Sequence, residues 1–162
     1  YIFVFRGLIE FSDSPEELAA VLAHEIGHVE KRHLVSKMVK EFGITVMISV
    51  LSGGDNVMLS ELGRAVMSSA FDRKQERDAD RYGLDLLVKS KVSPKSMAVF
   101  FRKLNRKSES VEKFSENLEF LMSHPHNNSR IKASIEYPLP DQFKHEPFLS
   151  NWNRAKKSVE KE

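Results

Sequence analysis

The feature that most constrains the fold of this chain is the pentapeptide at residues 24–28, which has the sequence HEIGH. Because a helix turns about every 3.6 residues, His24 and His28 project from one face when this segment is helical. Two imidazoles one turn apart can share one metal ion, and Glu25 beside them can reach a water on that ion. The pentapeptide therefore predicts a helix that carries part of a zinc hydrolase site.

The sequence before the pentapeptide predicts where this helix begins. Ser14 can cap the helix, Pro15 suits its first position, and Glu17 would complete a capping box. Apolar residues then recur at helical spacing, namely Leu18, Leu22, Ile26 and Val29. We expect one long helix from about residue 14 to about residue 41.

The pentapeptide alone does not establish a metal site, because two histidines four residues apart also occur by chance on solvated helices. Catalytic zinc has three protein ligands and an open position for water. His33 lies about 180° from His24 on a helical wheel at about 100° per residue, so we expect His33 to pack or to face solvent instead of binding metal. The third ligand must therefore come from another segment.

A second predicted helix, at residues 71–89, offers that ligand. Glu76 and Asp80 are four residues apart and share one face of it, which also carries Ala79, Gly83, Leu86 and Leu87. Since a buried carboxylate is costly unless it is paired or bound to a metal, we expect Glu76 to be the third zinc ligand. We expect Asp80 to accept a hydrogen bond from the remaining ring N–H of a zinc-bound histidine. The alternative is a solvated helix surface on which both carboxylates pair with neighbouring arginines.

Three sequence blocks together resemble the M48 family of zinc metallopeptidases, which includes the Ste24, HtpX, Oma1 and BepA types. The blocks are GLI at residues 7–9 with ELAAVLAHEIGH at residues 17–28, ERDADRYG at residues 76–83, and SHPHNNSRI at residues 123–131. The resemblance implies one Zn²⁺ per chain, held by His24, His28 and Glu76. It also implies that Glu25 is the catalytic base and that Asp80 supports the site from behind.

The third block supplies two further candidate catalytic residues, His124 and Arg130. A residue before proline disfavours the helical region, so Pro125 should hold His124 in an extended or turn conformation. His124 near the metal could stabilise the oxyanion of a tetrahedral intermediate, while Arg130 could orient it or bind a substrate carbonyl or carboxylate. The alternative is a turn that caps a helix at residues 130–136. His126 could instead be a removable fourth ligand that closes the site.

This set of residues predicts hydrolysis without a covalent intermediate. Zinc lowers the pKa of its bound water and polarises the peptide carbonyl, and Glu25 would move the proton from that water to the leaving amine. The chain has no cysteine, which excludes a cysteine nucleophile and a thiolate zinc site. It also lacks the G-x-S-x-G and phosphate-loop patterns.

The first five residues, YIFVF, are rich in β-branched and aromatic side chains and predict a strand. The resemblance favours an edge strand beside the cleft, where an extended substrate could add through main-chain hydrogen bonds. The alternative is a core strand buried on both faces. Because the chain begins inside this strand without a methionine, we expect a trimmed chain that lacks the segment paired with it.

A length of 162 residues with 41% hydrophobic and 30% charged residues fits a single globular domain, residues 1–162, that ends in a helix and charged tail from about residue 146. A net charge of +2 gives no reason to expect nucleic acid as a partner. The apolar run at residues 44–51 is shorter than the roughly 20 residues that span a bilayer. We expect residues 43–59 to pack in the core or between subunits. They could instead associate peripherally with a membrane surface or form a flap over the cleft.

We therefore predict a mainly α (α+β) zincin-like domain with an active-site helix, a glutamate-ligand helix and a small β-sheet that has an edge strand. Further helices are predicted at residues 93–105 and 111–122. The predicted function is a zinc metalloendopeptidase that acts on unfolded, membrane or envelope proteins, and the resemblance implies protein quality control in a bacterial periplasm or at a membrane. The alternatives are a zinc-stabilised chaperone-like domain that binds clients without cleaving them, and a zinc amidase that acts on cell-wall peptides.

Overall fold

The structure is a computed structural model that describes residues 2–51, 57–109, 128–149 and 151–159. These residues form helices α1 (Arg6–Phe11), α2 (Pro15–Glu30), α3 (His33–Leu51), α4 (Val57–Lys89), α5 (Lys95–Glu109), α7 (Asn128–Ile135) and α8 (Trp152–Val159). The mainly helical class predicted from the sequence is confirmed. No strand occurs among the described residues, so the predicted small β-sheet is not found there.

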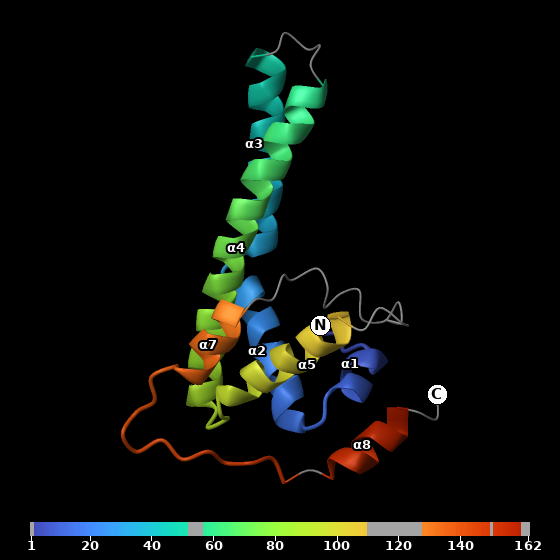
Figure 1. Ribbon diagram of the computed structural model, residues 1–162, viewed down its shortest axis with the longest axis vertical. Helices are drawn as coiled ribbons and strands as arrows, with labels where there is room; N and C mark the ends of the chain where they lie inside the picture. Colours follow the sequence, from blue (N-terminus) through green and yellow to red (C-terminus); the bar gives the residue numbers. More distant parts are fainter. Residues whose placement is uncertain (1, 52–56, 110–127, 150, 160–162) are drawn as a thin grey trace.

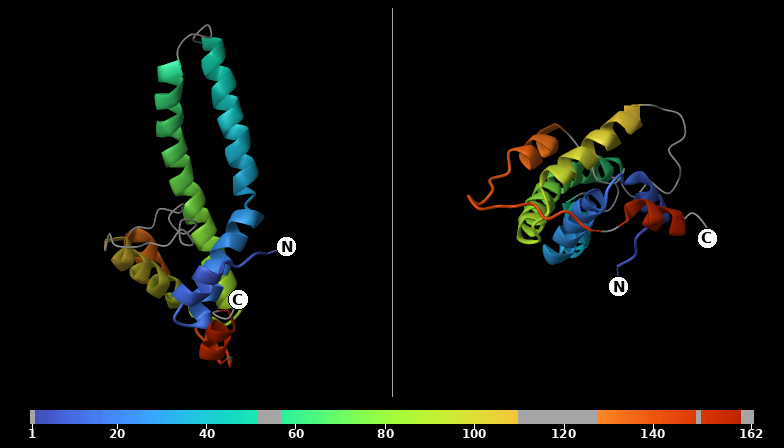
Figure 2. Two further views of the ribbon diagram at one scale, coloured as in Figure 1. Left: turned by 90° about the vertical axis from the view of Figure 1, so that its right-hand side faces the viewer. Right: turned by 90° about the horizontal axis from the view of Figure 1, so that it is seen from below.

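The molecule consists of a helical body and a long two-helix arm (Figure 1). α3 and the first half of α4 run antiparallel and form the arm, whereas the second half of α4 continues into the body. There α2 packs along α4, while α5 packs against both α2 and α7 (Figure 2). α1 lies against α8, which corresponds to the helix predicted near the C-terminus. α4 is therefore the one described helix that is shared by the arm and the body.

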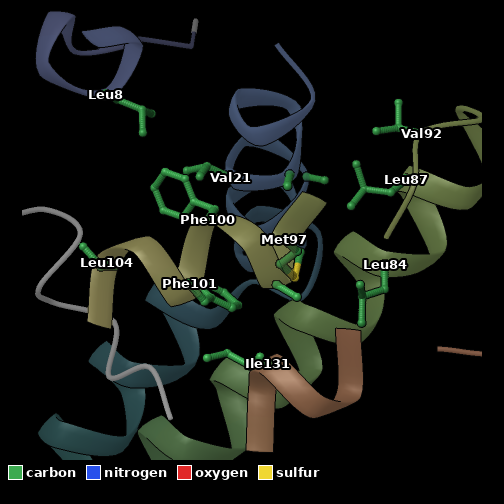
Figure 3. Close-up of a cluster of buried hydrophobic side chains, with 13 residues drawn as sticks. Leu8, Val21, Leu84, Leu87, Val92, Met97, Phe100, Phe101, Leu104 and Ile131 are labelled. Carbon is green, nitrogen blue, oxygen red and sulfur yellow. The ribbon is translucent and has the colours of Figure 1, made fainter. Parts of the chain in front are cut away.

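The hydrophobic core lies in the body and fixes α2 against α4 (Figure 3). Its most deeply buried large side chains come from α5, where Phe100 and Met97 are each 1% exposed. They pack with Val21 of α2 and with Leu84 and Leu87 of α4. The pentapeptide and the predicted glutamate ligand lie on these same two helices, so the core also sets the spacing of the candidate site.

The predicted start of α2 is confirmed, with one change in its capping. The Ser14 hydroxyl accepts a hydrogen bond from the Glu17 backbone N–H at 3.3 Å, and Pro15 is the first helical residue. The Glu17 carboxylate accepts from the backbone N–H of Asp13 at 3.1 Å, one residue earlier than in a capping box. Lys103 of α5 lies 2.8 Å from the same carboxylate, so this ion pair joins the start of α2 to α5.

The prediction of one helix from residue 14 to residue 41 is wrong. α2 ends at Glu30, and α3 begins at His33. Arg32 between them has φ 52°, a left-handed conformation that ends a right-handed helix. The Arg32 N–H bonds to the Val29 carbonyl, which tightens the last turn before the break. A helical wheel assumes an unbroken helix, so the angle of about 180° between His24 and His33 does not hold across this break.

The prediction that residues 43–59 pack in the core is wrong for those of them whose side chains the structure describes. Val46, Met47 and Val50 on α3 are 46%, 50% and 76% exposed. They continue an exposed apolar stripe that begins near the body and includes Leu34, Val35, Met38, Val39 and Phe42. Packing between subunits stays a prediction, and residues 52–56 lie outside the described residues. None of the described helices is both long enough and apolar enough to cross a membrane.

The predicted N-terminal strand is not found. Residues 2–5 are irregular, and Phe3 is 85% exposed. An extended segment becomes part of a sheet only when a second strand satisfies its backbone groups, and no other strand occurs in the described ranges. Of the remaining predicted helices, residues 93–105 correspond to α5 and residues 130–136 to α7, while residues 111–122 lie outside the described residues.

Candidate metal centre

Close contact between the backbones of α2 and α4 builds the candidate centre. A Cβ atom on Gly27 would lie 2.7 Å from the carbonyl oxygen of Ala79, and one on Gly83 would lie 3.0 Å from the backbone nitrogen of His24. The first distance is shorter than real Cβ atoms show, and the second is tight enough that the neighbouring main chain would have to shift. Glycine at these two positions therefore lets the helices touch. This contact brings the histidines of α2 within reach of the carboxylates on α4.

Three side chains from these helices converge on one point. His24 Nε2 and His28 Nε2 lie 3.1 Å apart. The Glu76 carboxylate completes the triangle, with one oxygen 3.4 Å from His24 Nε2 and the other 3.3 Å from His28 Nε2. His24 and Glu76 are buried and His28 is half-buried, so the group sits at the edge of the core with one open side.

The triangle has the dimensions of a zinc site. Zinc binds imidazole nitrogen and carboxylate oxygen at about 2.0–2.2 Å, so neighbouring ligand atoms of a tetrahedron lie about 3.3–3.6 Å apart. The three observed separations, 3.1, 3.3 and 3.4 Å, need only small movements to reach that range. Two nitrogens and one oxygen are also a donor set that zinc prefers. The residues present therefore fit the predicted metal.

Asp80 and Arg130 form a buried charged pair behind His24. Asp80 Oδ1 lies 2.9 Å from His24 Nδ1. Arg130 donates to both Asp80 oxygens, from Nε at 2.6 Å and from Nη2 at 2.7 Å, and its Nη1 lies 2.9 Å from Glu76 Oε2. Arg130 Nη2 and His24 Nδ1 lie 3.4 Å apart because both donate to the same oxygen, Asp80 Oδ1. All four of these side chains are at least nine-tenths buried.

This arrangement shifts the proton affinities of His24 and Asp80 in opposite directions. Burial by itself would lower the pKa of His24, but hydrogen bonds to Asp80 and Glu76 outweigh it and raise that pKa to about 9. Burial would raise the pKa of Asp80, but hydrogen bonds from His24 and Arg130 outweigh it and lower that pKa. Asp80 therefore stays a carboxylate, and its proximity fixes a hydrogen on His24 Nδ1.

His33 packs against the other side of His28 and is not one of the three converging side chains, as predicted, but its contact with the His28 ring was not predicted. Its Nδ1 is 3.0 Å from His28 Nδ1, and the two ring centroids are 4.9 Å apart. Burial, together with the neighbouring His28 ring, lowers the pKa of His33. Gln75 of α4, which the sequence did not single out, donates from its side-chain amide to the His33 carbonyl at 2.9 Å. Both contacts depend on the break at Arg32, which no glycine or proline marks.

The other predicted site residues have different positions. Glu25 is half-buried and lines a groove of about 620 Å³ that is also bounded by His28 and Glu76. Glu25 also borders a small apolar cavity of about 20 Å³ that is lined by residues of α2 and α5 and by Arg130. His124 and His126 lie outside the described residues. The structure thus brings together the three predicted ligands, Asp80 and Arg130.

The chain matches the family described as Peptidase family M48 over residues 1–137. It is 32% identical to the beta-barrel assembly-enhancing protease of Yersinia pestis over 80% of this chain and 29% of that protein. It is 34% identical to the metalloprotease LoiP of Escherichia coli over 65% of this chain and 44% of that protein. It is 30% identical to the mitochondrial metalloendopeptidase OMA1 of Schizosaccharomyces pombe over 90% of this chain and 43% of that protein.

The chain spans less than half the length of each of these relatives. No solved structure shows significant similarity to it. The family match covers α1 to α7 and includes every residue of the candidate centre. The chain belongs to peptidase family M48.

Proposed function

We propose that this chain is the catalytic domain of a zinc-dependent endopeptidase. The observation that carries the proposal is the triangle of His24, His28 and Glu76, whose ligand atoms have the separations of a tetrahedral zinc site. Family membership supports the same reaction class. The Glu25 carboxylate at the edge of the groove favours catalysis over a structural metal, since structural zinc needs no neighbouring base.

His24, His28 and Glu76 would hold the zinc, which when bound supplies a Lewis acid for the peptide carbonyl and lowers the pKa of water. Glu25 takes the proton of the attacking water and passes it to the leaving amine. Asp80 holds the proton of His24 on Nδ1 and so leaves Nε2 unprotonated towards the metal. Arg130 helps to keep Asp80 ionised, and it also lies against the Glu76 carboxylate. We also keep His124 as a candidate for oxyanion stabilisation, with Arg130 as the group that could orient it.

The groove indicates a polypeptide substrate. It extends from Glu25 and His28 to the exposed apolar residues Leu34 and Val35 at the start of α3. Unfolded segments expose apolar side chains that such a surface can bind, whereas small hydrophilic substrates gain nothing from it. In place of the predicted edge strand, we propose that this groove and the adjoining stripe on α3 hold the substrate.

The names of the relatives suggest the biological setting. One relative is named for assembly of β-barrels and another for mitochondria. We propose that the chain acts on unfolded membrane or envelope proteins in quality control, in a bacterial periplasm or at a membrane. The stripe on α3 is compatible with a peripheral membrane association.

The decisive experiment is the substitution Glu25→Gln, assayed for bound zinc and for casein cleavage. We expect the variant to bind one zinc per chain and to lose casein cleavage, because the ligands remain while the base is gone. Glu30→Gln is the matched control, since Glu30 is an exposed glutamate on the same helix, and it should cleave normally. Undiminished cleavage by Glu25→Gln would refute the proposal. Zinc-loaded wild type that binds casein without cleaving it would indicate the chaperone-like role, and cleavage of cell-wall peptides alone would indicate the amidase.

A further inference from the structure

His33 is a buried histidine that the proposed reaction does not use. It is 7% exposed, although it begins the helix that leads away from the body. Its ring meets the His28 ring edge to face at an interplanar angle of 78°, with the two Nδ1 atoms 3.0 Å apart. His28 is thus enclosed between the predicted metal position at Nε2 and the His33 ring at Nδ1.

Once His28 binds a metal, the position of the hydrogen between His28 Nδ1 and His33 Nδ1 is determined. A ligand nitrogen carries no hydrogen, so metal on His28 Nε2 places the ring hydrogen on Nδ1. Two ring nitrogens at 3.0 Å can form a hydrogen bond only when one donates and the other accepts. His28 must then be the donor, and His33 must accept at Nδ1 as a neutral ring with its own hydrogen on Nε2.

Two features outside the ring pair hold His33 in this place. Arg32 adopts the left-handed conformation, which turns the chain so that His33 returns towards His28. Gln75 is 7% exposed and donates to the His33 carbonyl at 2.9 Å, so α4 holds the first turn of α3 by its main chain. The same helix carries Glu76, the neighbouring residue, which faces the metal position. The position of His33 is therefore tied to that of the predicted ligands.

We propose that His33 is the positioning residue for His28, accepting the Nδ1 hydrogen of His28 and holding its Nε2 towards the metal. Asp80 contacts the Nδ1 of His24 in the corresponding way, so each histidine ligand has its own acceptor. The two acceptors differ in charge, since Asp80 is an anion and His33 is neutral. This inference rests on the proposed zinc function and adds His33 to the groups that build the centre.

The test compares His33→Leu with His33→Asn, using zinc affinity measured by competition with a chelator. Leucine keeps an apolar volume but has no acceptor, so we expect zinc affinity to fall roughly 10- to 100-fold. The asparagine carboxamide oxygen can take the place of Nδ1, so His33→Asn should stay within a few-fold of wild type. His145→Leu is the control, because His145 is exposed and far from the centre in sequence, and it should bind zinc as wild type does.

A spectroscopic readout on the wild type keeps the proposal testable even if His33→Leu does not fold. In the zinc-loaded protein, nitrogen NMR should show His28 bound through Nε2, with a slowly exchanging hydrogen on Nδ1. A zinc-loaded wild type with His28 bound through Nδ1 would overturn the proposal. So would a folded His33→Leu protein with wild-type affinity. Wild type that binds no zinc would instead defeat the proposed function.

Discussion

At the scale of single residues, Arg130 decides the charge balance of the centre. It contacts both Asp80 oxygens and one oxygen of Glu76, and it is 4% exposed. Although burial lowers the pKa of His24, hydrogen bonds to Asp80 and Glu76 raise it to about 9, so His24 binds a proton in the metal-free site. Metal binding therefore replaces a proton on His24 with a cation.

Zinc binding should consequently release a proton and should tighten as pH rises. The pKa of His24 is about 9, against 6.5 for an ordinary histidine, so the metal-free site is protonated at pH 7. Since zinc needs the unprotonated ring, the His24 contribution to affinity should increase about tenfold per pH unit from pH 7 up to about pH 9. Calorimetric titration in two buffers of different ionisation enthalpy measures the protons released at each pH.

The raised pKa of His24 also makes the stability of the metal-free protein depend on pH. Because the folded pKa exceeds the unfolded one, the proton on His24 stabilises the metal-free protein fully below about pH 6.5, and this contribution is lost as pH rises through about 9. Asp80→Asn removes the anion that holds the proton, so it should release fewer protons to zinc at pH 8. Zinc affinity that is constant between pH 7 and pH 9 would contradict the assignment.

At the scale of elements, the contact of α2 with α4 depends on Gly27, and Gly27→Ala should loosen it. Alanine is better than glycine in a helix by up to about 1 kcal/mol, but overpacking costs about 1–3 kcal/mol. Here the added Cβ would meet the Ala79 main chain at 2.7 Å and 3.0 Å, which cannot rotate away. We expect a lower free energy of unfolding in urea together with weaker zinc binding, because α4 must move away from the histidines.

Gly43→Ala is the matched control for this prediction. Gly43 is also helical, in α3, and a Cβ there would have no atom within 4 Å. Only the helix preference changes, so stability should rise by up to about 1 kcal/mol with zinc affinity unaltered. Equal behaviour of the two variants would show that α2 and α4 do not touch at Gly27.

The elements also show what the sequence could predict and what it could not. Glu76 and Asp80 lie on an uninterrupted stretch of α4, so the helical period correctly predicted their inward face. The break at Arg32 has a positive φ without glycine, which local sequence does not mark, and the wheel count failed beyond it. The pairing of Arg130 with Asp80 joins residues 50 apart in the chain, a tertiary contact that spacing alone cannot give. The strand predicted for residues 1–5 needed a partner that no described segment supplies.

At the scale of the whole molecule, the metal would join α2 to α4 across the body, so its removal should lower the melting temperature. A ligand at a thousand times its dissociation constant stabilises a fold by about 4 kcal/mol. For a chain of this size that is worth roughly 8–16 °C. Thermal unfolding followed by circular dichroism, with zinc and with a chelator, measures the difference. Glu76→Ala should lose this zinc-dependent increment, and identical wild-type midpoints in both conditions would argue against a bound metal.

The arm and the centre share their helices, and this has a mechanical consequence. α4 is one helix of 33 residues, so Val57 lies about 28 Å along its axis from Glu76 at about 1.5 Å per residue. α4 passes through the ligand Glu76 on its way into the body, and α3 begins at His33, whose ring contacts the ligand His28. We therefore expect a displacement of the outer part of the arm to move both of these sides of the centre. Binding of a partner to the outer part of the arm is therefore expected to alter the geometry of the metal site.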